Sequence, residues 1–167
     1  MGYASFNLEV EGREIVVIGG GSVAERKVLT ILPAGARVRI ISPILTYELQ
    51  RLRDSGAISH VHRGYCSGDL QGAFLAIAAT NRREINREVG REAKGLGILA
   101  EITDAPEEGN VTSPALFRQG DITIAVSTGN RAPALAARMR REIANLFGPE
   151  YAKTAALMGA IREKLLT

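Results

Sequence analysis

Residues 13–24, REIVVIGGGSVA, combine a short β-branched run with three consecutive glycines. The run at 15–18 is apolar without interruption, which is typical of a strand buried on both faces. After the glycines, apolar residues recur at helical spacing until Pro33 and Gly35 end the predicted helix. Residues 36–41 predict a second strand. A strand, a helix and a strand within about 30 residues form one βαβ unit, for which we expect a right-handed crossover.

The same alternation continues along the chain. Further strands are predicted at 57–63, 73–79 and 98–102, with helices at 45–53 and 82–94. This order favours an α/β fold, a Rossmann-like doubly wound parallel sheet. Residues 110–118 and 122–127 then predict two strands joined by a tight turn, a β-hairpin. Two C-terminal helices follow, at 134–147 and 151–166, and in the second of them Leu157, Ile161 and Leu165 are expected to face inward.

The glycine turn matches the G-x-G-x-x-G/A pattern of dinucleotide-binding folds. Gly19 permits the tight turn, Gly21 lets the backbone approach a pyrophosphate, and Ala24 keeps the helix close to the sheet. Ser22 and Val23 begin the helix, where unpaired N–H groups and a partial positive charge favour an anion. The motif therefore predicts NAD as a cofactor. The alternative is a tight turn that holds no ligand.

The end of the second predicted strand lacks the acidic residue that would bind the ribose hydroxyls. Ile41-Ser42-Pro43-Ile44 stands there instead, so that the Ser42 hydroxyl or backbone groups near Ile44 would have to serve. Arg39 lies inside the strand and is therefore a poor partner for a 2′-phosphate. This pattern favours NAD over NADP.

Polar residues also follow the fourth and fifth predicted strands. Thr80 and Asn81 follow the fourth strand, and Asp104 follows the fifth. Ligands of open α/β sheets bind beyond the carboxyl ends of the strands, so we expect these side chains at the cofactor site. An N-cap for the helix from Arg82 is the alternative role of Thr80 or Asn81. The Asp104 carboxylate could accept a proton, and an Asx turn before Pro106 is its alternative role.

Composition and charge exclude several classes of protein. The 167 residues are 46% hydrophobic and 23% charged, which excludes disorder as a global description. No apolar run approaches the roughly 18–20 residues of a membrane-spanning helix, and the N-terminus lacks the basic region of a secretory signal. The single cysteine, Cys66, predicts a reducing, cytoplasmic location. Seventeen of the 21 basic residues are arginine, which suits an acidic ligand, whereas 5% aromatic residues argue against a nucleic-acid partner.

Two histidines and the cysteine are candidate ligands of a metal site. His60 and His62 share one face of a predicted strand, and Cys66 follows them. A third ligand at suitable spacing is missing, so exposed strand histidines are the favoured interpretation and no metal site is predicted. The chain also lacks G-x-S-x-G, C-x-x-C and a Walker lysine.

Several motifs together resemble one family. They are GGGSVAERKV at 19–28, GARVRIISP at 35–43, GDLQGAFLAIAATN at 68–81 with Asn86 five residues later, ITDAPEEGNVTSPA at 102–115 and GDITIAVSTGNRAPALAARMRREI at 120–143. This order is similar to that of the precorrin-2 dehydrogenases, the dehydrogenase and ferrochelatase proteins of siroheme synthesis, and the resemblance covers residues 7–166. It implies NAD-dependent oxidation of precorrin-2 to sirohydrochlorin and, in some members, insertion of ferrous iron to give siroheme.

The resemblance also implies a domain organisation. It comprises an NAD-binding Rossmann domain over 1–112, a hairpin and helix that form a dimerisation region over 113–147, and a helical segment over 148–167. A hairpin outside the parallel sheet is a natural surface for a second copy, so we expect a homodimer. Dimeric members often continue further, which predicts that this chain is truncated at its C-terminus.

Carried over by position, the glycine turn through Val23 and the stretch 42–44 would contact NAD. Asp104 matches the family's essential aspartate, the candidate base in dehydrogenation, which is also implicated in chelation in bifunctional members. Thr128 lies in the loop that the family uses on the substrate side. Precorrin-2 is an acidic tetrapyrrole, and the candidate partners for its carboxylates are Arg118, Arg131, Arg138 and Arg141. For each arginine, a surface charge is an equally good interpretation.

This sequence departs from the family pattern in two places. Asn81 replaces a usual Asp, and Asn130-Arg131-Ala132 replaces a usual Gly-Lys/Thr-Ser before Pro133. Arg131 adds a fixed charge where an acidic substrate would approach, and Asn130 tolerates the positive φ of a turn. A rival hypothesis is a non-catalytic NAD-sensing module, which would need neither a tetrapyrrole cleft nor a base at Asp104.

Overall fold

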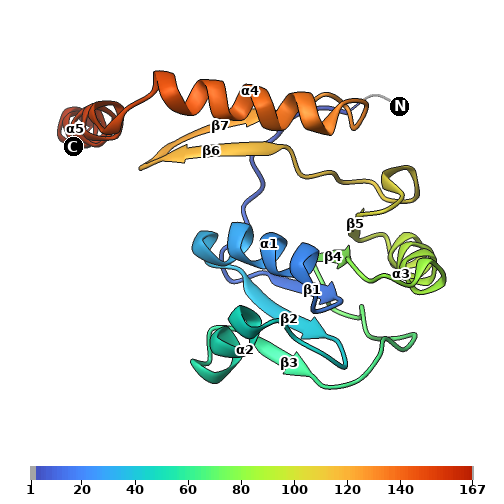
Figure 1. Ribbon diagram of the computed structural model, residues 1–167. Helices are drawn as coiled ribbons and strands as arrows, with labels where there is room; N and C mark the ends of the chain where they lie inside the picture. The colour runs from blue at the N-terminus through green and yellow to red at the C-terminus, as the bar shows by residue number, and fades with distance from the viewer. Residues whose placement is uncertain (1–2, 167) are drawn as a thin grey trace. The chain divides into compact units, whose positions relative to one another are not determined.

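Five parallel strands form the main sheet of the computed structural model, which describes residues 3–166 (Figure 1). They are β1 (Glu14–Ile18), β2 (Arg37–Ile41), β3 (Ser59–Val61), β4 (Leu75–Ala78) and β5 (Leu99–Ile102). Their order in the sheet is β3-β2-β1-β4-β5, and each neighbouring pair is parallel. The predicted doubly wound parallel sheet is therefore confirmed.

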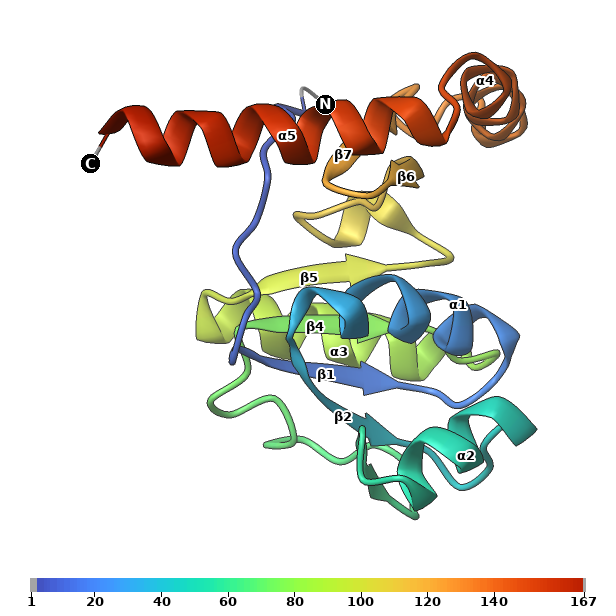
Figure 2. The same cartoon turned by 90° about the vertical axis from the view of Figure 1, so that its left-hand side faces the viewer.

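Helices cover both faces of this sheet (Figure 2). They are α1 (Ser22–Ile31) and α2 (Tyr47–Asp54) on one face and α3 (Arg83–Leu96) on the other. A hydrophobic core lies on each face of the sheet, and alternate residues of β1 belong to one or the other. Ile15 and Val17 pack with α1 and α2, whereas Val16 and Ile18 pack with α3. All four side chains are 0–1% exposed, which explains why the run has no polar interruption.

The centre of the sheet is a topological switch point. Ile18 at the end of β1 is level with Ile41 of β2 and with Ala78 of β4. The chain leaves β1 for α1 on one face, whereas it leaves β4 for α3 on the opposite face. Ligands of open α/β sheets bind at this place, outside the carboxyl ends of the strands.

The chain divides into two compact units. The first runs from Ser5 to Thr112 and holds the whole parallel sheet. The second begins at Ser113 and contains the rest of the described chain together with Tyr3 and Ala4. None of the helices within residues 3–166 combines the length and the apolar character needed to cross a membrane.

The second unit is built around an antiparallel hairpin. Its elements are β6 (Ala115–Gln119), β7 (Ile122–Val126), α4 (Pro133–Leu146) and α5 (Pro149–Leu166). Phe117 of β6 and Ala136 of α4 are buried in its small core, and the ring of Phe147 lies 6.4 Å from that of Phe117. The predicted hairpin and the two C-terminal helices are confirmed.

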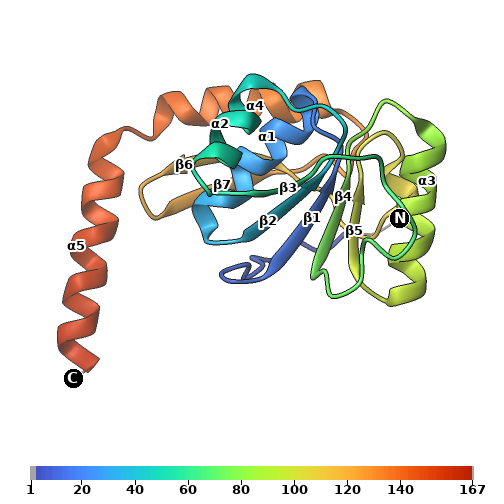
Figure 3. The ribbon, with the colours of Figure 1, turned by 90° about the horizontal axis from the view of Figure 1, so that it is seen from below.

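Two expectations about this region are wrong. The first hairpin strand begins at Ala115 instead of 110, because Asn110 is tied to β5 by hydrogen bonds to Ala100 and Ile98. Leu157 and Ile161 do not face inward but are 62% and 48% exposed, and Leu165 is 80% exposed. The start of α5 contacts the hairpin, and Figure 3 shows the helix continuing beyond the hairpin tip. Within residues 3–166 no residue of α5 is buried.

Two short 3-10 helices and two shortened strands also differ from the prediction, and the helix bounds are shifted by one or two residues. The elements concerned are a 3-10 turn at Leu32–Ala34 that ends α1, a second at Pro106–Glu108, and strands β3 and β4 that are each shorter than predicted. Gly35 has φ of 78°, which is the left-handed conformation expected where a helix is ended by glycine.

A candidate dinucleotide site at the glycine turn

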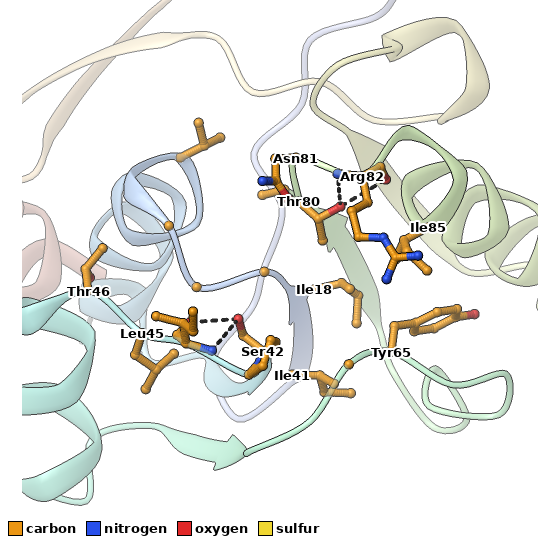
Figure 4. A pocket seen from close by; sticks show the side chains of 18 of the residues that line it. Ile18, Ile41, Ser42, Leu45, Thr46, Tyr65, Thr80, Asn81, Arg82 and Ile85 are labelled. Atoms are coloured by element: carbon orange, nitrogen blue, oxygen red, sulfur yellow. Dashed lines mark hydrogen bonds between the residues drawn. The ribbon is translucent and has the colours of Figure 1, made fainter.

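A cavity of about 730 Å³ lies at the carboxyl ends of β1, β2 and β4 (Figure 4). Its lining contains every residue predicted to bind the cofactor, namely Gly19, Gly21, Ser22, Val23, Ser42, Pro43, Ile44, Thr80 and Asn81. Its volume falls within the range of roughly 300–1,000 Å³ that small-molecule sites occupy. The fold therefore brings three segments, far apart in the sequence, to one cavity inside the first unit.

The three glycines of the turn have different surroundings. Gly19 has φ of 115°, and a Cβ there would lie 2.4 Å from the carbonyl oxygen of Ala79. A Cβ at Gly20 would lie 2.1 Å from the carbonyl oxygen of Ile44. A Cβ at Gly21 would have nothing within 4 Å, so this residue borders open space. The first two glycines allow close backbone packing, and the third leaves room for a ligand. The need for Gly20 was missed, because the fingerprint leaves that position open.

The start of α1 offers hydrogen-bond donors to this space. Gly21 is the N-cap residue, and it supplies no side chain to cap the helix. The first N–H groups of a helix have no partner within the helix, so those of Ser22 and Val23 are available on the cavity wall. Together with the helix dipole they favour a bound anion such as a diphosphate.

The loop after β2 is shaped by Ser42. Its hydroxyl donates to the carbonyl oxygen of Ile44 at 2.7 Å, and the residue is 6% exposed. The hydroxyl proton is thus engaged within the loop and is not free for a ribose. No Asp or Glu is among the lining residues, and Arg39 is occupied by Glu14 and by the carbonyl oxygen of Asp69.

The loop after β4 is held by a buried amide. Asn86 of α3 is 0% exposed and forms hydrogen bonds to the backbone and the hydroxyl of Thr80. The N-cap residue of α3 is Arg82, and no side chain caps the helix. The N-cap alternative for Thr80 and Asn81 is therefore wrong, because α3 begins at Arg83 and the amide that the Thr80 hydroxyl accepts from, that of Arg82, precedes the helix.

The loop after β3 contributes Tyr65, which the sequence patterns did not single out. Its hydroxyl donates to Glu92 of α3, and that carboxylate also accepts from the amides of Gly68 at 3.0 Å and Leu70 at 3.1 Å. Burial, and then the hydrogen bond to Glu92, raises the pKa of Tyr65. For Glu92, burial acts to raise the pKa, but the hydrogen bonds from Tyr65 and the two amides bring it below its ordinary value.

Asp104, the predicted base, lies just outside the cavity lining. It follows Thr103, which lines the cavity, and its side chain is 36% exposed. The Nε of Arg83 lies 3.8 Å from a carboxylate oxygen of Asp104, and Arg83 also pairs with Glu108. The hydrogen bond to Arg83 lowers the pKa of Glu108. Within residues 3–166 the Asp104 carboxylate makes no hydrogen bond of the Asx-turn type.

The predicted substrate residues belong to the second unit, and none lines this cavity. Arg118, Arg131 and Arg141 are exposed, and Arg138 pairs with Glu142 at 2.7 Å. The hydroxyl of Thr128 accepts from the amide of Ala132. Asn130 has φ of 63°, which confirms that this position needs a residue that tolerates a positive φ.

Within residues 3–166, His60 on β3 and His62 just after it form no metal centre with neighbouring side chains. The rings of His60 and His62 stack with their centroids 5.6 Å apart, and Nε2 of His60 lies 2.8 Å from the carbonyl oxygen of Ser42. In the described part of the chain, no three His, Cys, Asp or Glu side chains form a group that could hold a metal ion.

Comparison with known proteins places the chain in a family. Residues 6–115 match the family described as "Putative NAD(P)-binding", which confirms the predicted nicotinamide dinucleotide as cofactor. Residues 119–146 match the family described as "Sirohaem biosynthesis protein central".

Two relatives are siroheme synthases. The chain is 33% identical over 165 residues, 99% of its length, to siroheme synthase 1 of Aeromonas salmonicida (strain A449), and covers 35% of that protein. It is 39% identical over 157 residues, 94% of its length, to siroheme synthase of Ectopseudomonas mendocina (strain ymp), and covers 34% of that protein. The chain thus spans about a third of the length of these curated relatives.

A solved structure confirms the fold. SirC, a precorrin-2 dehydrogenase, superposes with a TM-score of 0.82 at 24% identity, and the match covers 96% of this chain and 79% of that one. The two family matches and the similarity to siroheme synthases confirm the resemblance that the motifs indicated. The chain belongs to the NAD(P)-binding family and has the sequence pattern of siroheme biosynthesis proteins.

Proposed function

We propose that this chain oxidises precorrin-2 to sirohydrochlorin with NAD as the hydride acceptor. The observation that carries the proposal is the cavity in which all nine predicted cofactor residues meet. The siroheme synthases that resemble the chain support precorrin-2 as the substrate.

The residues of the cavity fit NAD. The open space beside Gly21 gives a diphosphate room, and the amides of Ser22 and Val23 give it donors. The lining contains no carboxylate that would repel it. When NAD is bound, its nicotinamide accepts a hydride, and the protein has to hold the substrate and remove a proton.

Asp104 is the group that we assign to the proton. Its carboxylate is one residue away from the cavity wall, partly exposed, and paired with a single arginine at 3.8 Å. A partly exposed carboxylate at this edge is able to accept the proton that precorrin-2 loses. General-base assistance of this kind is typically worth about 10²–10⁴-fold in rate.

Exposed cations suit the acidic substrate. Arg118, Arg131 and Arg141 are exposed on the second unit, and we assign them, with Arg138 and the loop at Thr128, to the substrate carboxylates. Insertion of ferrous iron is a separate step that these contacts do not address, and it stays a prediction of the family resemblance.

The test is turnover of precorrin-2. Wild-type protein mixed with precorrin-2 and NAD should produce NADH together with the sirohydrochlorin spectrum. Asp104→Ala should lower kcat by about 10²–10⁴-fold and leave NAD affinity unchanged. Asp54→Ala, which removes an exposed aspartate at the end of α2, is the matched control and should react at the wild-type rate.

Each other outcome is informative. A wild-type rate in Asp104→Ala would show that another group takes the proton. NAD binding without any conversion of precorrin-2 by wild-type protein would contradict the proposal and favour the NAD-sensing module.

A further inference from the structure

Asn86 is a polar residue on the buried face of α3. It is 0% exposed, and its neighbours on that face are Val89, Gly90 and Ala93. A buried amide that lacks hydrogen bonds destabilises the folded protein by roughly 1–3 kcal/mol, so the partners of this side chain indicate its role.

Within residues 3–166, all of the hydrogen bonds of the Asn86 side chain go to one residue, Thr80. Its Oδ1 accepts from the amide of Thr80 at 3.2 Å and from the Thr80 hydroxyl at 2.7 Å. Its Nδ2 donates to the carbonyl oxygen of Thr80 at 3.0 Å. The Asn86 side chain thus binds every polar group of Thr80. The hydroxyl of Thr80 also accepts from the amide of Arg82 at 3.1 Å, as Figure 4 shows.

The clamped segment is a wall of the cavity. Residues 79–82 all line it, whereas Asn86 does not. The same segment is in contact with the glycine turn, because the carbonyl oxygen of Ala79 occupies the place that a Cβ of Gly19 would need. Asn86 therefore fixes the backbone that lies against the turn expected to hold the diphosphate.

We propose that Asn86 is a positioning residue for the nicotinamide dinucleotide, acting through Thr80. With the clamp in place, the 79–82 wall is ordered before the ligand arrives, so that binding does not have to order it. Without the clamp, part of the binding free energy would be spent on ordering this wall, and NAD would bind more weakly. This inference rests on the proposed placement of NAD in the cavity.

A second asparagine provides a matched control. Oδ1 of Asn110 accepts from the amide of Ala100 at 2.7 Å, and its Nδ2 donates to the carbonyl oxygen of Ile98 at 3.2 Å. Asn110 also clamps backbone to the sheet, but neither it nor its partners line the cavity. Asn110→Ala therefore removes a comparable backbone contact and changes no residue that lines the cavity.

The experiment measures NAD affinity by calorimetry, well below the unfolding temperature of each variant. Asn86→Ala should raise the Kd for NAD by about tenfold, which is the loss of one net hydrogen bond of roughly 1.4 kcal/mol. Asn110→Ala should leave that Kd unchanged. Asn86→Asp keeps the acceptor for the Thr80 amide and hydroxyl but replaces the Nδ2 donor with an oxygen that faces the Thr80 carbonyl oxygen, and should therefore also raise the Kd for NAD. In turnover assays Asn86→Ala should raise the KM for NAD and leave kcat at saturating NAD nearly unchanged.

The possible failures are distinguishable. If wild-type protein binds NAD and both folded Asn86 variants bind it equally well, the positioning role is overturned while the proposed function stands. An equal loss of affinity in Asn110→Ala would also overturn it, because the effect would then follow stability alone. If Asn86→Ala does not fold, the Kd of Asn86→Asp decides, with a wild-type value counting against the role. If wild-type protein binds no NAD, the proposed function itself fails.

Discussion

At the residue scale, three adjacent glycines serve two different purposes. Gly19 and Gly20 are needed because carbonyl oxygens of neighbouring loops lie where their side chains would be. Gly21 has ordinary backbone angles, with φ of −85°, and no protein atom stands in the way of a side chain. We infer that its lack of a side chain is required by the ligand alone.

This distinction gives a prediction for Gly21→Ala. The variant should unfold at a temperature close to that of wild type, because the added methyl group meets no protein atom. Its affinity for NAD should fall at least about tenfold, because the methyl group enters the space that the diphosphate needs. Calorimetric titration and thermal unfolding measure the two effects.

Gly95→Ala is the control for this substitution. Gly95 lies on α3, away from the cavity, and a Cβ there also meets nothing within 4 Å. It should bind NAD like wild type. Wild-type affinity in Gly21→Ala would place the diphosphate elsewhere.

Sequence patterns predict those residues whose role depends on local chain geometry. The glycines, the start of α1 and the residues after β2 and β4 follow from the βαβ pattern, because each lies next to a strand end. Tyr65 and Glu92 are 27 residues apart, and their hydrogen bond depends on how one loop crosses the sheet. No spacing in the sequence indicates such a contact. The exposed state of Leu157 was missed because periodicity shows that a face is apolar and does not show what covers it.

At the element scale, α3 organises two of the loops that line the cavity. Near its start Asn86 holds the loop after β4, and farther along Glu92 holds residues 65–70 of the loop after β3. A single helix on one face of the sheet thereby sets the position of two cavity walls. Asn86 and Glu92 therefore fix loop positions in addition to belonging to the helix.

Glu92 gives this arrangement a dependence on pH. Its pKa is lowered in the folded protein, so its ionised form stabilises the fold above its ordinary pKa of 4.5, and this contribution is lost as the pH falls through the lower folded value. At pH 7 we expect Glu92→Gln to unfold at a lower temperature than wild type, because its free energy of unfolding should be lower by about 1 kcal/mol or more. The difference should narrow as the pH falls below 4.5.

Thermal unfolding across pH measures this effect. Glu88 occupies an exposed position of the same helix, and Glu88→Gln should have a free energy of unfolding within about 0.5 kcal/mol of the wild-type value. A Glu92→Gln difference that stays constant or widens toward acid would contradict the account.

At the scale of the whole molecule, the described chain leaves apolar side chains on α5 without cover. Leu157 and Ile161 are four residues apart on one face of the helix, and each is about half exposed or more. Exposed apolar patches of this kind mark interaction surfaces. We predict that a second copy of the chain covers this face.

Sedimentation velocity tests the homodimer. Wild-type protein should sediment as a dimer, and the double variant Leu157→Glu, Ile161→Glu should sediment as a monomer with unchanged helix content. Ala156→Glu, whose position lies about 100° around α5 from that of Leu157, should remain a dimer. A monomeric wild type, or a double variant that stays dimeric, would exclude this face as the interface.

The central claim is that the cavity at the glycine turn holds NAD. A crystal structure of the protein with NAD tests it most directly. The account predicts density for the diphosphate within hydrogen-bond distance of the amides of Ser22 and Val23, beside Gly21. Density for NAD at any other place, with this cavity empty, would contradict it.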